Sequence, residues 1–326
     1  MNPGFWRGRR VFLTGHTGFK GTWLTQWLNF LGAEVTGYSL DEGDDVRDLS
    51  RLTAAMQHAK PELVIHLAAQ ALVRPSYEDP VRTFTTNVIG TVHALEAIRS
   101  VPSARVAVMA TSDKSYANSG ALHAFREEDP LGGNDPYSSS KACAELAINS
   151  YRASFFRGGG MRVVSVRAGN VIGGGDWARD RLVPDLVRAF RAGTPAAIRY
   201  PDATRPWQFV LDALHGYLLT AEHAWERSDL PDAFNFGPDP DDARSVGWLA
   251  DTIAARWGDG ASWHGPPGEH PHEEPTLALD SSRASQWLHW RPLLDVETVV
   301  AWTTDWYKSA RGLTVPQIRK FMELIP

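Results

Sequence analysis

The stretch from residue 9 to residue 32, RRVFLTGHTGFKGTWLTQWLNFLG, limits the possible folds more than any other part of the chain. A short apolar run ends in glycine, and bulky apolar side chains then recur at helical spacing until Gly32 supplies a stop signal. The pattern predicts a strand, a tight glycine-rich turn and an amphipathic helix. Such a helix must bury its apolar face against a sheet.

The same alternation continues through the first half of the chain. It predicts an α/β fold with a Rossmann-type, doubly wound parallel sheet that helices cover on both faces. After about Asn170 the regularity weakens into shorter periodic segments, which predicts a smaller mixed α/β lobe, with loops at 170–177, 200–208 and 236–245. The further predicted strands are 33–40, 62–69, 104–111 and 161–169, and the further helices are 49–59, 79–100 and 136–156.

Composition excludes several classes of protein. The formal net charge is −5 and no basic run is interleaved with aromatics, so neither nucleic acid nor an anionic membrane is an expected partner. Cys143 is the single cysteine, which rules out an intrachain disulfide, and no apolar run approaches the length of a membrane span. The first ten residues have no signal-peptide core, so we expect a cytoplasmic protein.

A glycine-rich turn joins the first predicted strand to the first helix. Gly15, Gly18 and Gly21 follow a G-x-x-G-x-x-G spacing, and Thr17 stands where the usual dinucleotide fingerprint has glycine. Glycines let the backbone approach a pyrophosphate, and the helix N-terminus offers unpaired N–H groups. The turn therefore predicts a dinucleotide site, with an ordinary tight turn as the alternative.

Asp41 lies 20 residues beyond Gly21, at the end of the second predicted strand. A carboxylate there can accept hydrogen bonds from ribose hydroxyls and repel a 2′-phosphate, which favours NAD over NADP. The alternative is a solvated loop acid, because Glu42, Asp44 and Asp45 crowd the same stretch.

Two further patterns indicate proton chemistry. Tyr137 and Lys141 lie four residues apart on a predicted helix, where a neighbouring cation would lower the pKa of the phenol. The stretch ATSDKSY places Ser112, Asp113 and Lys114 side by side just after a strand. In a regular strand Asp113 would point away from its two neighbours, so the chain must leave strand geometry for all three to face one cleft.

Together, TGHTGFKG, HLAAQ, SDK, YSSSK and RAGN resemble the extended short-chain dehydrogenase/reductase superfamily over nearly the whole chain. The resemblance implies a catalytic triad of Ser112, Tyr137 and Lys141, and a homodimer formed through the helices that carry 84–98 and 137–156. It also implies an NAD pocket and two contacts to a sugar nucleotide. The implied cofactor contacts are Phe19, Asp45, Val46, Ala68 and Ala69, and the implied substrate contacts are Asn170 and Arg205.

Within the superfamily, SDK, AGNVIGGGDWARDR and RPWQ resemble the NDP-hexose 4,6-dehydratases, and among these the branch that acts on CDP-linked glucose. This implies oxidation at C4, elimination of water across C5 and C6, and hydride return to C6, with bound NAD unchanged overall. We assign Asp113 as acid and Lys114 as base, taking the positions from the resemblance and the roles from chemistry. Ser112 would fix the reacting oxygen, and Lys141 would hold the ribose.

The resemblance also suggests two parts of the chain. We expect residues 1–170 to form the NAD-binding Rossmann domain, including the helix with Tyr137 and Lys141. Residues 171–326 would mainly form the lobe that binds the sugar nucleotide, with some segments returning to the first domain. Only residues 42–44 separate Asp41 from Asp45, fewer than is usual in the family, so the adenosine side of the pocket is expected to be more open.

Other interpretations compete with this one. An NDP-sugar 4-epimerase or 4-reductase would need the same triad without the acid and base, and a non-catalytic NAD-binding protein would not need Tyr137 beside Lys141. A histidine-rich stretch invites a metal site, but its spacing matches no standard zinc pattern and its prolines indicate a loop, so we expect no metal. Its residues are His264, His270, His272 and Glu273.

Overall fold

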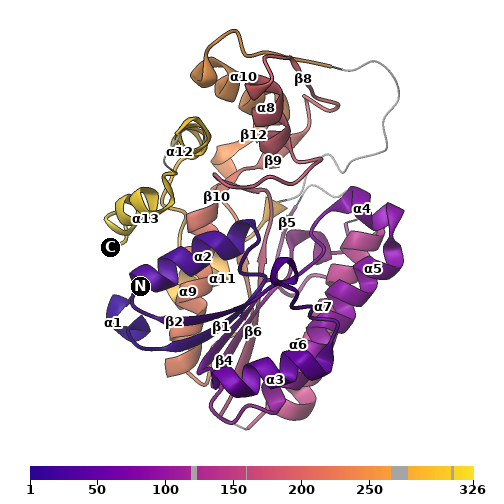
Figure 1. Ribbon diagram of the computed structural model, residues 1–326, viewed down its shortest axis with the longest axis vertical. Coiled ribbons are helices and arrows are strands. Elements are labelled where there is room, and N and C mark those ends of the chain that lie inside the picture. The colour runs from indigo at the N-terminus through magenta and orange to yellow at the C-terminus, as the bar shows by residue number, and fades with distance from the viewer. Residues whose placement is uncertain (119–122, 159, 266–277, 310–311) are drawn as a thin grey trace.

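A six-stranded parallel sheet forms the centre of the molecule (Figure 1). In spatial order its strands are β2 (Glu34–Tyr38), β1 (Arg10–Thr14), β3 (Leu63–His66), β4 (Val106–Ala110), β6 (Arg162–Ala168) and β11 (Ala233–Phe236). The computed structural model describes residues 1–118, 123–158, 160–265, 278–309 and 312–326.

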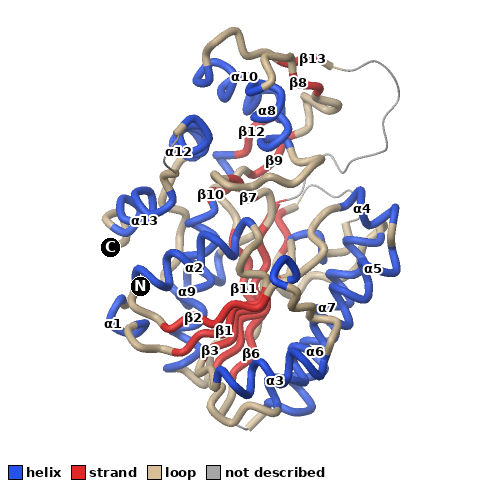
Figure 2. Tube along the Cα trace, in the orientation of Figure 1, coloured by secondary structure: helices blue, strands red, loops and turns tan. Residues whose placement is uncertain are grey.

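Helices cover both faces of this sheet, as the alternating sequence predicts (Figure 2). Successive strand residues alternate between the two faces, so Val11 and Leu13 join one apolar cluster while Phe12 joins the other. The first cluster includes α2 (Phe19–Phe30), α9 (Val210–Glu226) and α11 (Ser282–Leu288). The second includes α3 (Leu49–Ala59), α6 (Gly90–Arg99) and α7 (Pro136–Tyr151).

Both long predicted helices form, and each contains a π-helical turn. The helix predicted at 79–100 consists of α5 (Pro80–Phe84), the π turn η2 (Thr85–Ile89) and α6. The helix predicted at 136–156 consists of α7 followed by the π turn η4 (Arg152–Phe156). A π turn adds a residue to the turn and so shifts which side chains face the core afterwards.

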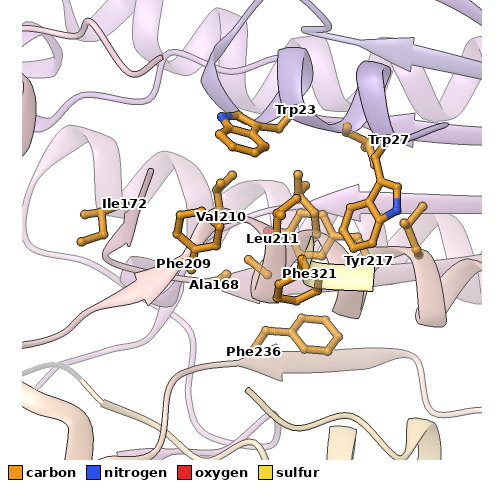
Figure 3. Packing of buried hydrophobic residues seen from close by; sticks show 14 of the residues in the cluster. Trp23, Trp27, Ala168, Ile172, Phe209, Val210, Leu211, Tyr217, Phe236 and Phe321 are labelled. Atoms are coloured by element: carbon orange, nitrogen blue, oxygen red, sulfur yellow. The ribbon is translucent and has the colours of Figure 1, made fainter. Parts of the chain in front are cut away.

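A cluster of aromatic side chains joins helix α2 to segments from the second half of the chain (Figure 3). Trp23 on α2 meets Phe209 edge-to-face, with ring centroids 5.9 Å apart. The Trp23 indole N–H donates to the carbonyl of Gly174 at 2.7 Å. Trp27 meets Phe321 in the same manner at 5.6 Å. Residues far apart in the sequence therefore share one apolar core with the Rossmann sheet.

A smaller mixed lobe lies at one end of the sheet (Figure 1). Its helices include α8 (Leu182–Arg191) and α10 (Val246–Trp257), and α12 (Val296–Lys308) packs on α10. Helix α13 (Thr314–Met322) packs on α2. The two-stranded pairs are β7 (Val171–Ile172) with β10 (Gln208–Phe209), β9 (Thr204–Pro206) with β12 (Ala243–Ser245), β8 (Ala196–Ala197) with β13 (Trp263–His264), and β5 (Ala124–Phe125) with β14 (Ala278–Leu279).

The three predicted loops at 170–177, 200–208 and 236–245 are therefore partly wrong, because each contains a short strand. Strands of only two or three residues are too short to show an alternation of apolar and polar side chains, so the sequence did not reveal them. The remaining short elements are α1 (Pro3–Trp6), η1 (Leu40–Glu42), α4 (Val73–Glu78), η3 (Asp113–Ser115) and η5 (Pro240–Asp242).

The strand order places a topological switch point between β1 and β3. The chain runs from β1 outward to β2 and then returns to the other side of β1, so the connections after β1 and β3 diverge at their carboxyl ends. Open α/β sheets bind ligands in the crevice at such a point. In the part of the chain that the structure describes, no helix has the length and apolar character needed to span a membrane. The cytoplasmic location stays a prediction.

Candidate active site

A cleft of about 1420 Å³ opens at the carboxyl edge of the sheet, where the sheet faces the smaller lobe. Every residue that the sequence analysis assigned to the site lines this cleft. The dinucleotide candidates among them are Gly15, Gly18, Phe19, Gly21, Asp41, Asp45, Val46, Ala68 and Ala69. The chemical and substrate candidates are Ser112, Asp113, Lys114, Tyr137, Lys141, Asn170 and Arg205.

The glycine-rich turn packs too closely for other residues. Gly15 has φ +71°, and a Cβ there would lie 2.8 Å from the backbone nitrogen of Ala68, which follows β3. A Cβ on Gly21 would lie 2.1 Å from the carbonyl oxygen of Gly15. Gly18 caps α2 without a side-chain hydrogen bond, so the positive helix end faces the cleft unneutralised. These features form a cradle into which a pyrophosphate fits.

Thr17 takes a role that the usual glycine at this position could not perform. Its hydroxyl hydrogen-bonds to Ser39 at 2.6 Å and donates to Asp41 Oδ2 at 3.0 Å. Thr17, which stands where the fingerprint has glycine, thereby orients the Asp41 carboxylate, and this carboxylate is expected to accept hydrogen bonds from a ribose. Asp45 instead binds Arg47, with Nε 2.9 Å from Oδ2, and these side-chain hydrogen bonds lower the pKa of Asp45.

The chain leaves strand geometry after β4, as the SDK stretch requires. Ser112 caps the short 3-10 helix η3, and its side chain accepts a hydrogen bond from the backbone N–H of Lys114. Asp113 Oδ1 accepts from Ser112 Oγ and from the same N–H, both at 2.9 Å. A Cβ on Gly169 would lie 1.7 Å from Asp113 Oδ2, so only glycine leaves room for this carboxylate. All three SDK residues reach the cleft.

Helix α7 presents Tyr137 and Lys141 to the same cleft. Asp135 caps the helix by accepting from the N–H of Ser138, and Pro136 occupies its first turn. The prediction of a lowered pKa for Tyr137 is wrong: burial raises it to about 12, a hydrogen bond with Ser112 opposes this, and Asp113 adds to it. Burial and the positive charge of Lys20 lower the pKa of Lys141 to about 8, against the charge of Glu145.

Lys20 is a cleft residue that the sequence analysis missed. Its amine is buried and donates to the hydroxyl of Tyr217 at 3.1 Å. Burial and then Arg181 lower the pKa of Lys20 to about 8, while Asp113 raises it. A lysine inside the glycine motif, between Phe19 and Gly21, was the available signal. Its position at the start of a helix was consistent with an ordinary solvated residue.

The far side of the cleft is tied to the sheet edge by charged side chains, which were also missed. Arg181 pairs with Asp176 at 2.8 Å and donates to the carbonyl of Ala71 at 3.2 Å. At the rim, Arg74 on α4 pairs with Asp180 at 2.8 Å. These contacts join the 176–181 segment to residues that follow β3. The Arg181–Ala71 and Arg74–Asp180 contacts each join residues more than a hundred positions apart, so no local pattern revealed them.

Within the described residues, no cluster of histidine, cysteine or carboxylate side chains could hold a metal ion. His264 is exposed at the end of β13. His270, His272 and Glu273 lie outside the described residues.

A doubly wound sheet, a glycine-rich turn at its switch point, and serine, tyrosine and lysine at one cleft define a short-chain dehydrogenase/reductase architecture. The sequence pattern described as the NAD dependent epimerase/dehydratase family matches residues 11–237. The chain belongs to this family.

Two curated relatives show different degrees of similarity. The CDP-glucose 4,6-dehydratase of Salmonella typhimurium is 43% identical over 95% of this chain and 93% of its own length. A UDP-glucose 4-epimerase of Mycolicibacterium smegmatis is 27% identical over 92% of this chain and 99% of its own. Among solved structures, the UDP-glucose 4-epimerase of Thermus thermophilus in complex with NAD superposes with a TM-score of 0.79 at 24% identity. That match covers 92% of this chain and 99% of the other, and it supports the fold.

Proposed function

We propose that the protein is an NAD-dependent NDP-hexose 4,6-dehydratase that converts CDP-glucose to CDP-4-keto-6-deoxyglucose and water. The observation that carries the proposal is the presence of Asp113 and Lys114 in the same cleft as Ser112, Tyr137 and Lys141. An oxidoreductase or epimerase needs only the last three. The similarity to the Salmonella CDP-glucose 4,6-dehydratase supports this function over that of the less similar epimerases.

NAD fits the residues at the sheet edge. The backbone of Gly15 to Gly18 and the N-terminus of α2 would hold the pyrophosphate, and Asp41 would accept from the ribose hydroxyls of the adenosine. Val46, Ala68 and Ala69 offer apolar surface beside them. When bound, NAD supplies the hydride acceptor for C4 and the hydride donor for C6. Lys141 would hold the second ribose through its ammonium group.

The oxidation step needs a base at the C4 hydroxyl. Tyr137 takes this proton as the C4–H bond breaks, and Ser112, hydrogen-bonded to Tyr137, fixes the same oxygen. With a pKa of about 12, the phenol is protonated at neutral pH, so its ionisation needs positive charge nearby. Lys141, one helical turn further along α7, supplies this charge. The resulting ketone makes the C5 hydrogen acidic.

The elimination step uses the other two residues. Lys114 removes the C5 proton, and Asp113 donates a proton to the C6 hydroxyl, which leaves as water. A double bond would form between C5 and C6, C5 would then regain a proton, and bound NAD would supply the hydride for C6. Atoms and electrons balance with the cofactor unchanged. The hydrogen bonds from Ser112 and the Lys114 N–H hold the Asp113 carboxyl in place for this role.

The decisive experiment follows deuterium from C4. The purified protein is incubated with NAD and with CDP-, dTDP- and GDP-glucose labelled at C4, and the products are analysed by mass spectrometry and NMR. We expect label at C6 of a 4-keto-6-deoxy product with the CDP sugar. Inversion at C4 with retained label would instead support a 4-epimerase, label in free NADH would support a 4-reductase or oxidase, and unchanged sugars would support a non-catalytic NAD-binding protein.

We also propose a functional division near residue 170, with the first part binding NAD and the second mainly binding the sugar nucleotide. Helix α9, strand β11 and helix α11 would be the segments that return to the first part, since they belong to the sheet and one of its covering layers. To test this division, cleft residues before and after position 170 are substituted, and the KM for NAD and the KM for the sugar nucleotide are measured. Substitutions before position 170 should change mainly the KM for NAD, and those after it mainly the KM for the sugar nucleotide.

We propose further that the protein is a homodimer that pairs through the helices that carry residues 84–98 and 137–156, together with α5, which leads into the first of them. These helices pack against each other and leave large apolar side chains in solvent. Val81 is 73% exposed, Leu146 57% and Phe155 50%. Light scattering after size exclusion should give twice the chain mass. Introducing charge with Leu146→Glu should yield monomers, whereas Leu324→Glu, at an exposed leucine near the C-terminus, should not.

A further inference from the structure

A buried ion pair lies behind the cleft, between helix α7 and strand β6. Glu145 receives two hydrogen bonds from Arg167, from Nε to Oε1 and from Nη2 to Oε2, both at 2.8 Å. The side chains are 0% and 3% exposed. Neither residue lines the cleft. Removing two charges from water has a large desolvation cost, so this pair requires a reason for being there.

The pair contacts both ends of the segment that carries Ser112, Asp113 and Lys114. At one end, the hydroxyl of Thr111 donates to Glu145 Oε1. At the other end, Nη1 of Arg167 donates to the hydroxyl of Tyr116 at 2.7 Å. Tyr116 in turn donates to Asn235 Oδ1 on β11 at 2.7 Å. The residues on either side of the SDK segment are therefore both fixed to one buried centre.

Glu145 also continues the face of α7 that carries Tyr137 and Lys141. The three residues are spaced four apart, which places them on one side of the helix. Burial lowers the pKa of Lys141 and so does Lys20, whereas the negative charge of Glu145 raises it. Arg167 faces Glu145 from β6 at hydrogen-bond distance, so any change at Glu145 also alters the balance around Lys141. The other titratable side chains that interact electrostatically with Lys141 are Lys20 on α2 and His66 at the end of β3. Asp113 and Arg181 in turn act on Lys20 and on Tyr137.

We propose that Glu145, held by Arg167, is a positioning residue for the dehydration, with two effects. It holds the Ser112–Lys114 segment in place against α7, and it maintains the positive charge on Lys141. The proposal rests on the proposed function, because it assigns Ser112, Tyr137 and Lys141 their roles. Glu145 touches neither substrate nor cofactor, so it acts only through these residues.

The test compares a variant that removes charge with one that removes only a hydrogen bond. Glu145→Gln keeps the shape but not the charge, whereas Ser165→Ala removes a 3.0 Å hydrogen bond to Glu145 Oε2 and leaves the charge. Without the carboxylate, Lys141 loses its proton at lower pH. We expect the alkaline limb of kcat/KM to move down by about one pH unit or more in Glu145→Gln. Ser165→Ala should leave the alkaline limb of kcat/KM at its wild-type pH. Glu145→Asp restores the negative charge, so its alkaline limb should lie close to that of the wild type.

An unchanged alkaline limb in Glu145→Gln, with only a lower kcat, would overturn the electrostatic role. Circular dichroism and thermal unfolding show whether each variant folds. If Glu145→Gln does not fold, Tyr116→Phe tests the positioning role, because it releases one end of the segment from Arg167 and leaves both Arg167–Glu145 hydrogen bonds and both charges in place. It should lower kcat without moving the limb, and an unchanged kcat would overturn that role.

A second readout separates this proposal from the proposed function. Lys141 would contact the ribose of NAD, so NAD affinity, measured by quenching of tryptophan fluorescence, should weaken at high pH. In Glu145→Gln, NAD binding should begin to weaken at a lower pH, and the difference from the wild type should equal the shift of the alkaline limb of kcat/KM. If the wild type binds NAD but does not convert CDP-glucose, the proposed function fails, while the binding titration still tests the link between Glu145 and Lys141. An identical titration in both proteins would overturn the link.

Discussion

The two walls of the cleft are built in different ways. One wall, which we call the chemical wall, consists of the residues that follow β4 and the first turns of α7. Its Ser112, Asp113, Tyr137 and Lys141 are each less than a tenth exposed. The opposite wall, which we call the binding wall, consists of residues 176–207 from the smaller lobe and contains two- and three-residue strands. On the binding wall, Tyr200 and Arg205 are partly exposed. We therefore expect packing to fix the proposed reacting groups more tightly than these two side chains.

The largest expected effect is on the chemical wall. Tyr137→Phe removes the proposed proton acceptor, and kcat should fall by about a thousandfold, within the range for a lost general base. Tyr200→Phe makes the same chemical change on the binding wall and should alter mainly KM. Steady-state kinetics with CDP-glucose measure both. A Tyr137→Phe enzyme that retains a tenth of the wild-type kcat would show that the walls do not differ in this way.

The next effect distinguishes two residues of the chemical wall. Lys114→Met and Asp113→Asn should each lower kcat by about a hundredfold. Only Lys114→Met should stop exchange of the C5 hydrogen with deuterated solvent, because that step needs the base and not the acid. NMR of recovered sugar nucleotide reports the exchange. If Asp113→Asn stops the exchange and Lys114→Met preserves it, the two roles are reversed.

A smaller effect is expected on the binding wall. Arg205→Lys replaces a planar guanidinium group, which can donate two parallel hydrogen bonds, with a compact ammonium group. This change should raise the KM for CDP-glucose by about tenfold and leave kcat nearly unchanged. Arg244 lies directly opposite Arg205 in the β9–β12 register but outside the cleft, so Arg244→Lys is a matched control. A fall in kcat for Arg205→Lys with an unchanged KM would place this arginine among the reacting groups.

The smallest effect is on the stability of the sheet edge below the chemical wall. His66 is buried between Thr14 and Thr91, and burial lowers its pKa to about 3. Below about pH 6.5 the unfolded state therefore binds a proton at His66 that the folded state does not bind. The free energy of unfolding falls as the pH drops from about 6.5 towards 3. At pH 5 the loss is about 2 kcal/mol relative to pH 7.5.

Urea unfolding at these two pH values measures this loss. His66→Gln should lose less stability on acidification than the wild type, by about this amount. The exposed His58 provides the control, and His58→Gln should behave like the wild type. Equal acid sensitivity in all three proteins would mean that His66 is accommodated in its charged form.

The chemical wall was also easier to predict from the sequence. Regular alternation and the glycine motif predict the sheet, and the strand ends then bring Gly15, Ala68 and Ser112 to one edge. The binding wall had weaker signals, because its short strands pair with distant partners. Arg205 and Asn170 were found only through resemblance to a family.

Burial was the main quantity that the sequence could not provide. Glu145 lies four residues after Lys141 and reads as an ordinary exposed helix position, since its partner Arg167 is on another element. The pKa of Tyr137 was predicted in the wrong direction for the same reason. Lys141 is visible in the spacing, whereas the burial that raises the pKa of Tyr137 is a property of the folded chain.

The strand order has a consequence for the order of synthesis. Strand β11 is the last strand of the central sheet to leave the ribosome, and it completes the sheet beside β6, which lies more than sixty residues earlier in the chain. Until residue 236 has emerged, β6 is an open edge with unpaired backbone groups, which can pair with other nascent chains. A fragment ending near residue 170 would keep that edge permanently. Residues 1–170 should therefore aggregate when they are produced without the strand that the second half of the chain adds to the sheet.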